Sequence, residues 1–332
     1  MIIHCVAYTR HRRLCMKTSC SGKRLLVTGG AGFIGSHLVR RLIDKQADVI
    51  VLAKADSDLW RLDDCEGDYR LVVADIADEN AVLRILTNTH PDGLFHLAAY
   101  GVDFAQQDIS QAVSVNVTGT VNVVKAMQAC GCKRIVTVGS GAEYGNHQGA
   151  VNEDAPLRPE NAYASTKAAA TIIAHQYAAQ HDIGIVTLRP FGVYGESEPR
   201  HKIFCHAILS MLRGETLNLT PCTQHRDYCY VGDVVDALIA AYENEALTKA
   251  VFNIGTGKAC PLRDFIEQIR TMINPIGEIR YGALPYRTNE LWSPLPDVRL
   301  AMQQLDWHST HSLVDGLKKT ISWYYQNSHY YQ

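Results

Sequence analysis

A tyrosine and a lysine four residues apart, Tyr163 and Lys167, are the pair in this sequence best suited to proton transfer. On a helix, one turn separates them, so both side chains lie on the same face. A free tyrosine has a pKa of about 10, and a nearby ammonium group favours its phenolate. The pair can therefore exchange a proton with a hydroxyl or carbonyl group. A chance surface pair is the alternative, because this spacing alone has low specificity.

Ser140 lies at the end of an apolar run, in the segment Val138-Gly-Ser-Gly-Ala-Glu-Tyr-Gly145. A serine at the carboxyl end of a strand can hydrogen-bond a reacting oxygen and stabilise the charge that develops on it. The alternative is a serine that serves only the turn.

Three glycines spaced three residues apart, Gly29, Gly32 and Gly35, follow another apolar run. The first allows a tight turn, the second lets backbone approach a pyrophosphate, and the third lets a helix pack close to the strand. The helix would begin with free N–H groups and the positive end of its dipole. The segment, with Phe33 and Ile34 in it, predicts a dinucleotide site. Its spacing is GxxGxxG rather than GxGxxG, and a glycine turn without nucleotide is the alternative.

These residues sit in a chain whose apolar runs alternate with helical patterns up to residue 190. After the first apolar run, the predicted strands are 48–53, 69–73, 93–98, 133–139 and 184–188, and the predicted helices are 78–89, 110–129 and 162–180. The alternation predicts an α/β fold with a doubly wound parallel (Rossmann) sheet. Ligands bind at the carboxyl ends of such strands.

After residue 190 the pattern loosens, and a smaller, discontinuous α/β C-terminal lobe is predicted. Segments 231–243 and 251–254 return to the sheet, whereas 261–273 and 312–324 are helices of the lobe. The predicted domains are 23–190 plus about 228–258 for the dinucleotide, and 191–227 plus about 259–327 for the substrate. Residues 1–22 are expected to be a disordered extension, with a targeting arm as the alternative.

Composition excludes several function classes for this chain of 332 residues. The net charge of −2 gives no signal for nucleic acid, and no apolar run is long enough to span a membrane. The ten cysteines lack the spacing of a zinc site. We expect no metal, no nucleic-acid or membrane partner, and a cytoplasmic location.

Taken in order, the motifs resemble the extended short-chain dehydrogenases/reductases of the nucleotide-sugar epimerase/dehydratase/reductase family. The resemblance runs from Leu25 to about Trp307. It includes the glycine turn and the segments at 75–78, 96–99, 116–120, 139–145, 163–167, 189–195, 225–233 and 287–290. It implies a Ser140, Tyr163 and Lys167 triad, a nicotinamide dinucleotide and a nucleoside-diphosphate sugar as the substrate of the C-terminal lobe.

The same resemblance assigns contacts along the cofactor. Asp75 and Ile76 would contact the adenine, and Ala98 and Ala99 would pass beneath the dinucleotide. Further cofactor residues are Asn116, which has a structural or water-relay role in the family, Pro190, and Tyr163 and Lys167 themselves.

On the substrate side, Arg226 and Arg287 resemble arginines that grip the diphosphate, because the guanidinium fork matches phosphate oxygens. Glu290 would take a ribose hydroxyl. Ordinary surface salt bridges are the alternative for both arginines. The family's asparagine in the turn after Arg189 is replaced by Gly192, so one usual diphosphate contact is missing.

Other departures from the family pattern limit the reactions that this chain is expected to catalyse. Family dehydratases carry an acidic pair after the strand-end serine or threonine, and here Gly141 and Ala142 occupy those positions. Epimerases acting at two ring carbons need a further acid/base pair, often with a cysteine, which the loop 100–107 lacks. His201 could be one partner, although a plain loop histidine is the simpler interpretation.

The end of the second predicted strand bears on the cofactor. Ala53 stands where members that prefer NAD carry a carboxylate, and Lys54 follows it. A missing carboxylate and an added lysine favour a ribose phosphate. We therefore expect NADP(H), with NAD(H) possible because Asp56 and Asp58 lie close by.

The C-terminal segments 287–292, 296–298 and 305–307 are similar to those of CDP-paratose and CDP-abequose synthases. The expected function is NADPH reduction of a 4-keto-6-deoxy nucleoside-diphosphate sugar at C4. An NAD-dependent C4 epimerase is the alternative, and a non-catalytic binding protein is the remote one. Fold analogy predicts a homodimer through helices 110–129 and 162–180.

Overall fold

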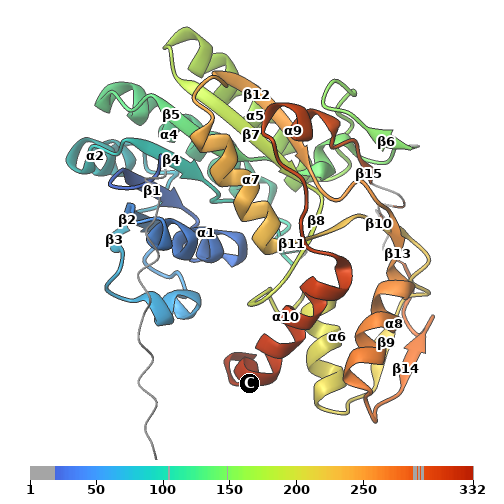
Figure 1. Cartoon of the computed structure of the whole chain (residues 1–332). Helices are drawn as coiled ribbons and strands as arrows, with labels where there is room; N and C mark the ends of the chain where they lie inside the picture. Colours follow the sequence, from blue (N-terminus) through green and yellow to red (C-terminus); the bar gives the residue numbers. More distant parts are fainter. Residues whose placement is uncertain are drawn as a thin grey trace, which may run out of the picture.

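The computed structural model describes residues 19–103, 105–147, 149–286, 290, 292 and 295–331. Its centre is a seven-stranded sheet in the order β12–β7–β5–β4–β1–β2–β3, with every neighbouring pair parallel (Figure 1). The strands are β1 (Arg24–Thr28), β2 (Asp48–Ala53), β3 (Arg70–Val73), β4 (Gly93–His96), β5 (Arg134–Val138), β7 (Gly184–Pro190) and β12 (Lys249–Ile254). The predicted doubly wound parallel sheet is confirmed.

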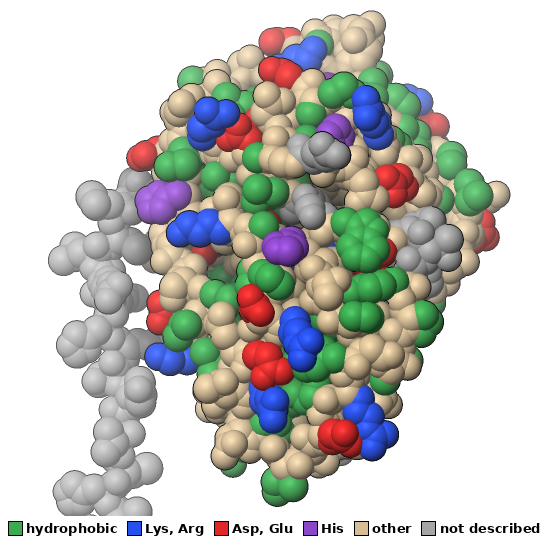
Figure 2. Space-filling view, turned by 90° about the vertical axis from the view of Figure 1, so that its right-hand side faces the viewer, with side chains coloured by type: hydrophobic (Ala, Val, Ile, Leu, Met, Phe, Trp, Pro, Cys, Tyr) green, Lys and Arg blue, Asp and Glu red, His purple; other side chains and the backbone are tan. Residues whose placement is uncertain are grey.

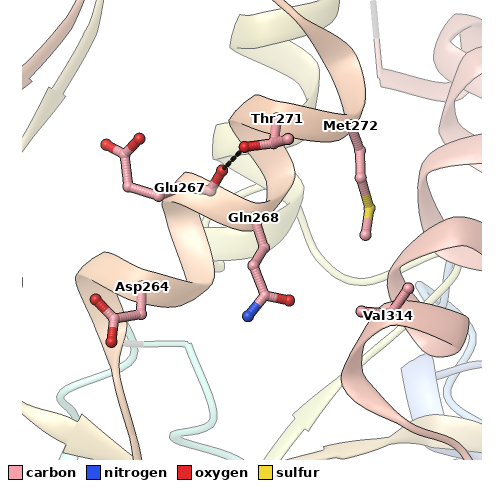
Figure 3. Close-up of a pocket in the computed structure, with 6 residues that line it drawn as sticks. All are labelled: Asp264, Glu267, Gln268, Thr271, Met272 and Val314. Atoms are coloured by element: carbon pink, nitrogen blue, oxygen red, sulfur yellow. Dashed lines mark hydrogen bonds between the residues drawn. The ribbon is translucent and has the colours of Figure 1, made fainter.

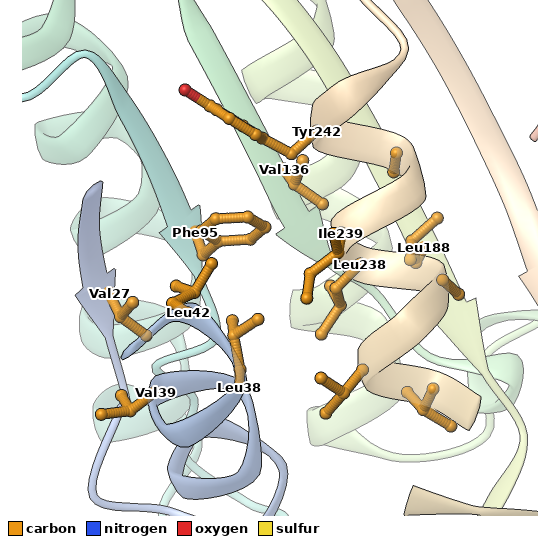
Figure 4. Close-up of a cluster of buried hydrophobic side chains, with 14 of the residues drawn as sticks. Val27, Leu38, Val39, Leu42, Phe95, Val136, Leu188, Leu238, Ile239 and Tyr242 are labelled. Carbon is orange, nitrogen blue, oxygen red and sulfur yellow. The ribbon is translucent and has the colours of Figure 1, made fainter. Parts of the chain in front are cut away.

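The strands are continuous apolar runs because both faces of the sheet are covered. Successive side chains point to opposite faces, so Leu25 and Val27 enter one hydrophobic cluster and Leu26 enters another. Helices α1 (Phe33–Asp44) and α7 (Val231–Glu243) cover the first face, as Figure 4 shows. The second face is covered by α2 (Glu79–Thr89), α4 (Gly119–Cys130) and α5 (Ala162–Gln180).

The strand order reverses between β1 and β4, since the chain first winds outward to β3 and then returns to β4 on the other side of β1. A reversal of this kind leaves a crevice at the carboxyl ends of the two strands. The glycine turn follows β1 at this crevice.

The long helix predicted at 110–129 is three elements. It consists of α3 (Ile109–Ala112), a π-helical turn η2 (Val113–Thr118) and α4. Helical periodicity continues through all three, so the sequence pattern does not reveal the π turn. Such turns are rare and occur frequently at functional sites.

A third hydrophobic cluster lies beside the sheet, among α6 (Ile203–Leu212), α8 (Leu262–Ile273) and α10 (Leu313–Asn327) (Figure 1). Short two-stranded ladders join β8 (Gly192–Tyr194) to β11 (Tyr228–Tyr230), β9 (Leu217–Leu219) to β14 (Ile279–Tyr281), β10 (His225–Arg226) to β13 (Cys260–Pro261), and β6 (Ala150–Val151) to β15 (Leu295–Pro296). The remaining elements are η1 (Trp60–Cys65), η3 (Gly141–Tyr144), α9 (Arg299–Gln304) and η4 (Ser328–Tyr331). The division of the chain into two domains stays a prediction.

Part of the predicted extension, residues 19–22, is within the described chain. Cys20 is fully buried in the cluster beneath α1 and α7, so residues 19–22 belong to the packed body rather than to an extension. Residues 1–18 lie outside the described part.

The surface drawn in Figure 2 mixes acidic and basic side chains rather than gathering one sign. Within the described ranges, no helix is both long and apolar enough to cross a bilayer.

Candidate active site

The parallel sheet brings the predicted site residues to one edge, because all of its strands end there. Gly29 follows β1, Lys54 follows β2 and Asp75 and Ile76 follow β3. Ala98 and Ala99 follow β4, Ser140 follows β5, and Pro190 ends β7.

The glycine turn meets the steric requirements of a dinucleotide site. Gly29 has a φ of +70°, and a Cβ there would lie 2.6 Å from the backbone nitrogen of Ala98. A Cβ on Gly35 would lie 2.1 Å from the carbonyl oxygen of Gly29, so the close approach of α1 to β1 needs glycine. Among the described residues, no side chain caps the N-terminus of α1 at Gly32. The N–H groups of Phe33 and Ile34 lie in the first turn of α1, where a helix offers them no acceptor, and this positive helix end suits a pyrophosphate.

Ser140 has a defined backbone position. It caps the short helix η3, and its side-chain oxygen accepts a hydrogen bond from the N–H of Ala142 at 3.2 Å. Glu143 completes a capping box by accepting the backbone N–H of Ser140 at 2.7 Å. The serine therefore serves its turn, and it also lies close enough to Tyr163 to lower the pKa of that phenol.

Tyr163 and Lys167 lie in the first turns of α5, as predicted. Asn161 caps this helix by accepting the N–H of Ala164 at 2.9 Å. Further along the helix, His175 contacts the hydroxyl of Thr187 on β7 at 2.8 Å, so α5 is fixed to the sheet by a buried polar contact. The tyrosine and the lysine are thereby held above the strand ends.

The protonation of the pair differs from the expectation drawn from spacing alone. Burial raises the pKa of Tyr163 to about 12; the hydrogen bond from Ser140 opposes the rise and the charge of Glu143 adds to it. Burial lowers the pKa of Lys167 to about 8, and the same carboxylate opposes that change. Desolvation outweighs the attraction between ammonium and phenolate, so Tyr163 is a phenol near neutral pH and suits the role of proton donor.

The π-helical turn contributes Asn116, which holds the loop after β4. Its side-chain oxygen accepts the N–H of Tyr100 at 2.8 Å, and its amide donates to the carbonyl of Tyr100 and to the hydroxyl of Thr166 at 2.9 Å each. Gly101, which follows Tyr100 in this loop, packs against Tyr163, because a Cβ on Gly101 would lie 3.1 Å from the Cβ of Tyr163. Asn116 thus links the loop to α5, which agrees with the structural role implied for it.

At the adenine side, Lys54 and Asp75 form an ion pair, with 3.4 Å between Nζ and a carboxylate oxygen. Both side chains are about two-fifths exposed, so the pair is open to solvent and to a ligand. Ile76 is buried against Gly119. The ion pair weakens the expected attraction of Lys54 for a ribose phosphate, because Asp75 already compensates part of the charge of the lysine.

At the substrate side, Arg226 and Glu290 pair with each other through Nη2 and Oε1. Both side chains are mostly buried. Because the arginine is partly neutralised, gripping a diphosphate would require sharing or exchanging this partner. Arg287 lies outside the described residues.

Two buried polar groups at the site were given no role by the sequence interpretation. Glu143 and Arg189 form an ion pair behind Ser140, and His96 at the end of β4 bridges the hydroxyls of Thr28 and Thr120. Burial lowers the pKa of His96 to about 3, so this histidine is a neutral bridge. The sequence signal that could have identified these groups is a charged or polar residue at the end of an otherwise apolar strand.

A surface pocket elsewhere does not belong to this site. It lies between α8 and α10 and contains none of the predicted cofactor or substrate residues (Figure 3). Its lining residues are Asp264, Glu267, Gln268, Thr271, Met272 and Val314.

Comparison with known proteins agrees with this geometry. The model of the NAD-dependent epimerase/dehydratase family matches residues 25–255. A UDP-glucose 4-epimerase of Mycolicibacterium smegmatis is 31% identical, covering 92% of this chain and 99% of the relative. The crystal structure of UDP-glucose 4-epimerase from Thermotoga maritima with UDP-glucose has a TM-score of 0.86 at 27% identity, covering 92% of this chain and 99% of the other.

A structure of MoeE5 in complex with UDP-glucuronic acid and NAD has a TM-score of 0.82 at 31% identity, covering 91% of this chain and 99% of the other. A trifunctional dehydratase, epimerase and reductase of UDP sugars from Arabidopsis thaliana is 30% identical over 93% of this chain, which spans about half (48%) of that longer protein. The chain belongs to the NAD-dependent epimerase/dehydratase family and is an enzyme of the extended short-chain dehydrogenase/reductase type.

Proposed function

We propose that this enzyme reduces a 4-keto-6-deoxy nucleoside-diphosphate sugar at C4 with NADPH. The observation that carries the proposal is the placement of Ser140 beside Tyr163 at the strand ends, next to the glycine turn. The nicotinamide, when bound, supplies the hydride. Ser140 holds the ketone oxygen at C4, the phenol of Tyr163 donates the proton to it, and Lys167 supports the charge that the tyrosine develops.

Dehydration is disfavoured by the packing after Ser140. A Cβ on Gly141 would lie 2.7 Å from the ring of Phe191, which fills the space that an acidic side chain would need. Without an acid and a base at 141 and 142, elimination of water lacks proton carriers.

Gly192, where the family has an asparagine, is also closely packed, because a Cβ there would lie 2.3 Å from the carbonyl oxygen of Asp227. The backbone of residue 227 therefore leaves no room for the usual asparagine.

A C4 epimerase is the second candidate, and the comparisons support it. This chain aligns with nearly the full length of relatives named UDP-glucose 4-epimerases. The same triad would take the proton from the C4 hydroxyl and later return it, while a bound NAD would hold the hydride between oxidation and reduction from the opposite face. This reaction needs a tightly held cofactor and a sugar that turns within the site.

The choice of NADP(H) rests on Ala53 and Lys54 at the end of β2. Since Asp75 already pairs with this lysine, a 2′-phosphate would share the ammonium with it. NAD(H) is the competing cofactor, and solved relatives such as MoeE5 are complexes with NAD.

A denaturing release assay followed by a stoichiometric assay tests the function. We expect purified protein to carry little NAD and to consume one NADPH for each 4-keto sugar nucleotide, followed as loss of nicotinamide absorbance. The alternative epimerase would carry stoichiometric NAD and show no net oxidation of cofactor. No consumption with CDP-, UDP- or dTDP-linked 4-keto-6-deoxyhexoses would overturn the reductase proposal.

We also propose a homodimer through the region of α4 and α5. Four apolar side chains are exposed on α3, η2 and α5, which pack together: Ile109, Val113, Ile172 and Ile173. Burial of such a face against a second copy removes apolar surface from water.

Charge introduced into this face is expected to separate the subunits. Ile172→Glu places an ion on a side chain that is 60% exposed, so the fold should persist while the dimer dissociates. The solution mass at micromolar concentration, measured by light scattering, should fall by half. Leu83→Glu on α2, also an exposed apolar position, is the control that should keep the mass of the wild type. A monomeric wild type would refute the dimer.

A further inference from the structure

Glu143 is a fully buried acid directly behind the site serine. Its Oε1 accepts the backbone N–H of Ser140 at 2.7 Å, and its Oε2 accepts Nε–H of Arg189 at 2.9 Å. The guanidinium of Arg189 and the Ser140 N–H both favour the ionised form of this carboxyl group. Burial raises the pKa of this carboxyl, and the guanidinium and the Ser140 N–H oppose the rise. A negative charge therefore lies under the strand end.

The chain makes specific room for this carboxylate. A Cβ on Gly139 would lie 2.5 Å from Oε1 of Glu143, so only glycine at 139 lets the carboxylate reach the N–H of Ser140. A buried ion pair is weak evidence for stability, because desolvation of two charges offsets their attraction. A hydrophobic pair would fill the same space without that cost. The arrangement points to a function of the charge rather than of the packing.

Neighbouring groups fix the ion pair in place. Nη1 of Arg189, on β7, donates to the hydroxyl of Tyr144 at 2.8 Å. That hydroxyl in turn donates to Oδ1 of Asn253, on β12, at 2.8 Å. The carboxylate is thus held from two strands, and so is the peptide of Ser140 that it binds.

The charge also acts on the proton-transfer pair of α5. The groups that face Glu143 are Ser140 and Tyr144 from its own turn, Arg189 from β7, and Tyr163 and Lys167 from α5. Its negative charge favours the phenol over the phenolate at Tyr163 and the ammonium over the amine at Lys167. The first effect preserves the phenol that donates the proton. The second preserves the ammonium that supports the charge left on Tyr163.

We propose that Glu143 is the positioning residue of this active site: its carboxylate orients Ser140 through its backbone N–H, and its buried charge acts on Tyr163 and Lys167. The mechanistic part rests on the proposed function. Titration of Tyr163 requires no sugar substrate, so failure of the proposed function and failure of the role of Glu143 can be told apart.

Glu143→Gln removes the charge and keeps an oxygen that can accept from Ser140. In protein with ¹³C-labelled tyrosine and saturating oxidised cofactor, the Tyr163 resonance is identified by its loss in Tyr163→Phe. Its titration midpoint should fall by about one pH unit in Glu143→Gln. In the reduction assay, kcat should fall about tenfold or more with KM for the sugar nearly unchanged, and the alkaline limb of the kcat profile should move to lower pH.

Glu153→Gln is the matched control. This acid also lies behind the site and accepts the N–H of Asn253 at 2.8 Å, without contacting Ser140. It should leave the Tyr163 titration and the pH profile unchanged. If Glu143→Gln does not fold, the double variant Glu143→Val/Arg189→Met removes both charges without leaving an unpaired ion, and it should show the same shift. An unchanged midpoint in a folded variant at position 143 overturns the proposal.

Discussion

Replacement of Tyr163 by phenylalanine is expected to lower kcat by about 10²–10⁴-fold, the range for loss of a general acid. The substitution deletes the proton donor and keeps the ring that packs against Gly101. Steady-state turnover with a 4-keto sugar nucleotide measures the loss. Cofactor affinity, followed by nicotinamide fluorescence, should fall far less than kcat, because the lost hydroxyl can give the dinucleotide at most one hydrogen bond.

Tyr177→Phe is the control for this variant, since Tyr177 lies on the same helix and its ring packs against His181 rather than at the strand ends. It should retain the turnover of the wild type. A Tyr163→Phe enzyme with comparable turnover would mean that another group delivers the proton, and the assigned mechanism would be wrong.

The second large effect is expected at the glycine turn. Gly35→Ala brings a Cβ to 2.1 Å from the carbonyl oxygen of Gly29, a contact between backbone segments that no side-chain rotation relieves. Helix α1 must move away from β1, at a cost of about 1–3 kcal/mol or more. We expect a lower unfolding midpoint in urea and a loss of cofactor binding, because the helix N-terminus shifts with the helix.

Gly32→Ala separates ligand approach from packing. Gly32 has a φ of −77°, and its Cβ would meet only the Gly29 oxygen, at 3.2 Å. This variant should fold nearly as well as the wild type and still bind the dinucleotide at least about tenfold more weakly, because its methyl group faces the pyrophosphate. Equal stability of the Gly35→Ala protein and the wild type would contradict the packing argument.

The sheet was predictable, and the triad could be proposed, because their signals are local. Apolar runs such as 48–53 and 133–139 carry the strands, and the glycine turn and the Tyr163–Lys167 spacing carry the site. The predicted parallel order then places these residues at one edge. Shared motifs identified the family for the same reason, and the matched region 25–255 agrees with them.

The parts that escaped prediction depend on contacts distant in sequence. Glu143 and Arg189 are 46 residues apart, and the residues next to each of them give no sign that the two form an ion pair. The protonation of Tyr163 could not be predicted from its spacing to Lys167, because the dominant influence is burial by the surrounding fold. Helix α6 and the two- and three-residue ladders were missed because such short or uniformly apolar segments carry little periodicity.

The separate hydrophobic cluster formed by α6, α8 and α10 has an evolutionary consequence. Ser140, Tyr163 and Lys167 all come from the sheet and from α5, and none belongs to that cluster. Mutations in that cluster can therefore accumulate without displacing the residues proposed for proton transfer. With the proposed sugar-binding role of this cluster, the substrate can diverge while the proposed proton-transfer residues stay in place. A graft of α6, α8 and α10 from a relative would then change the sugar that the enzyme accepts.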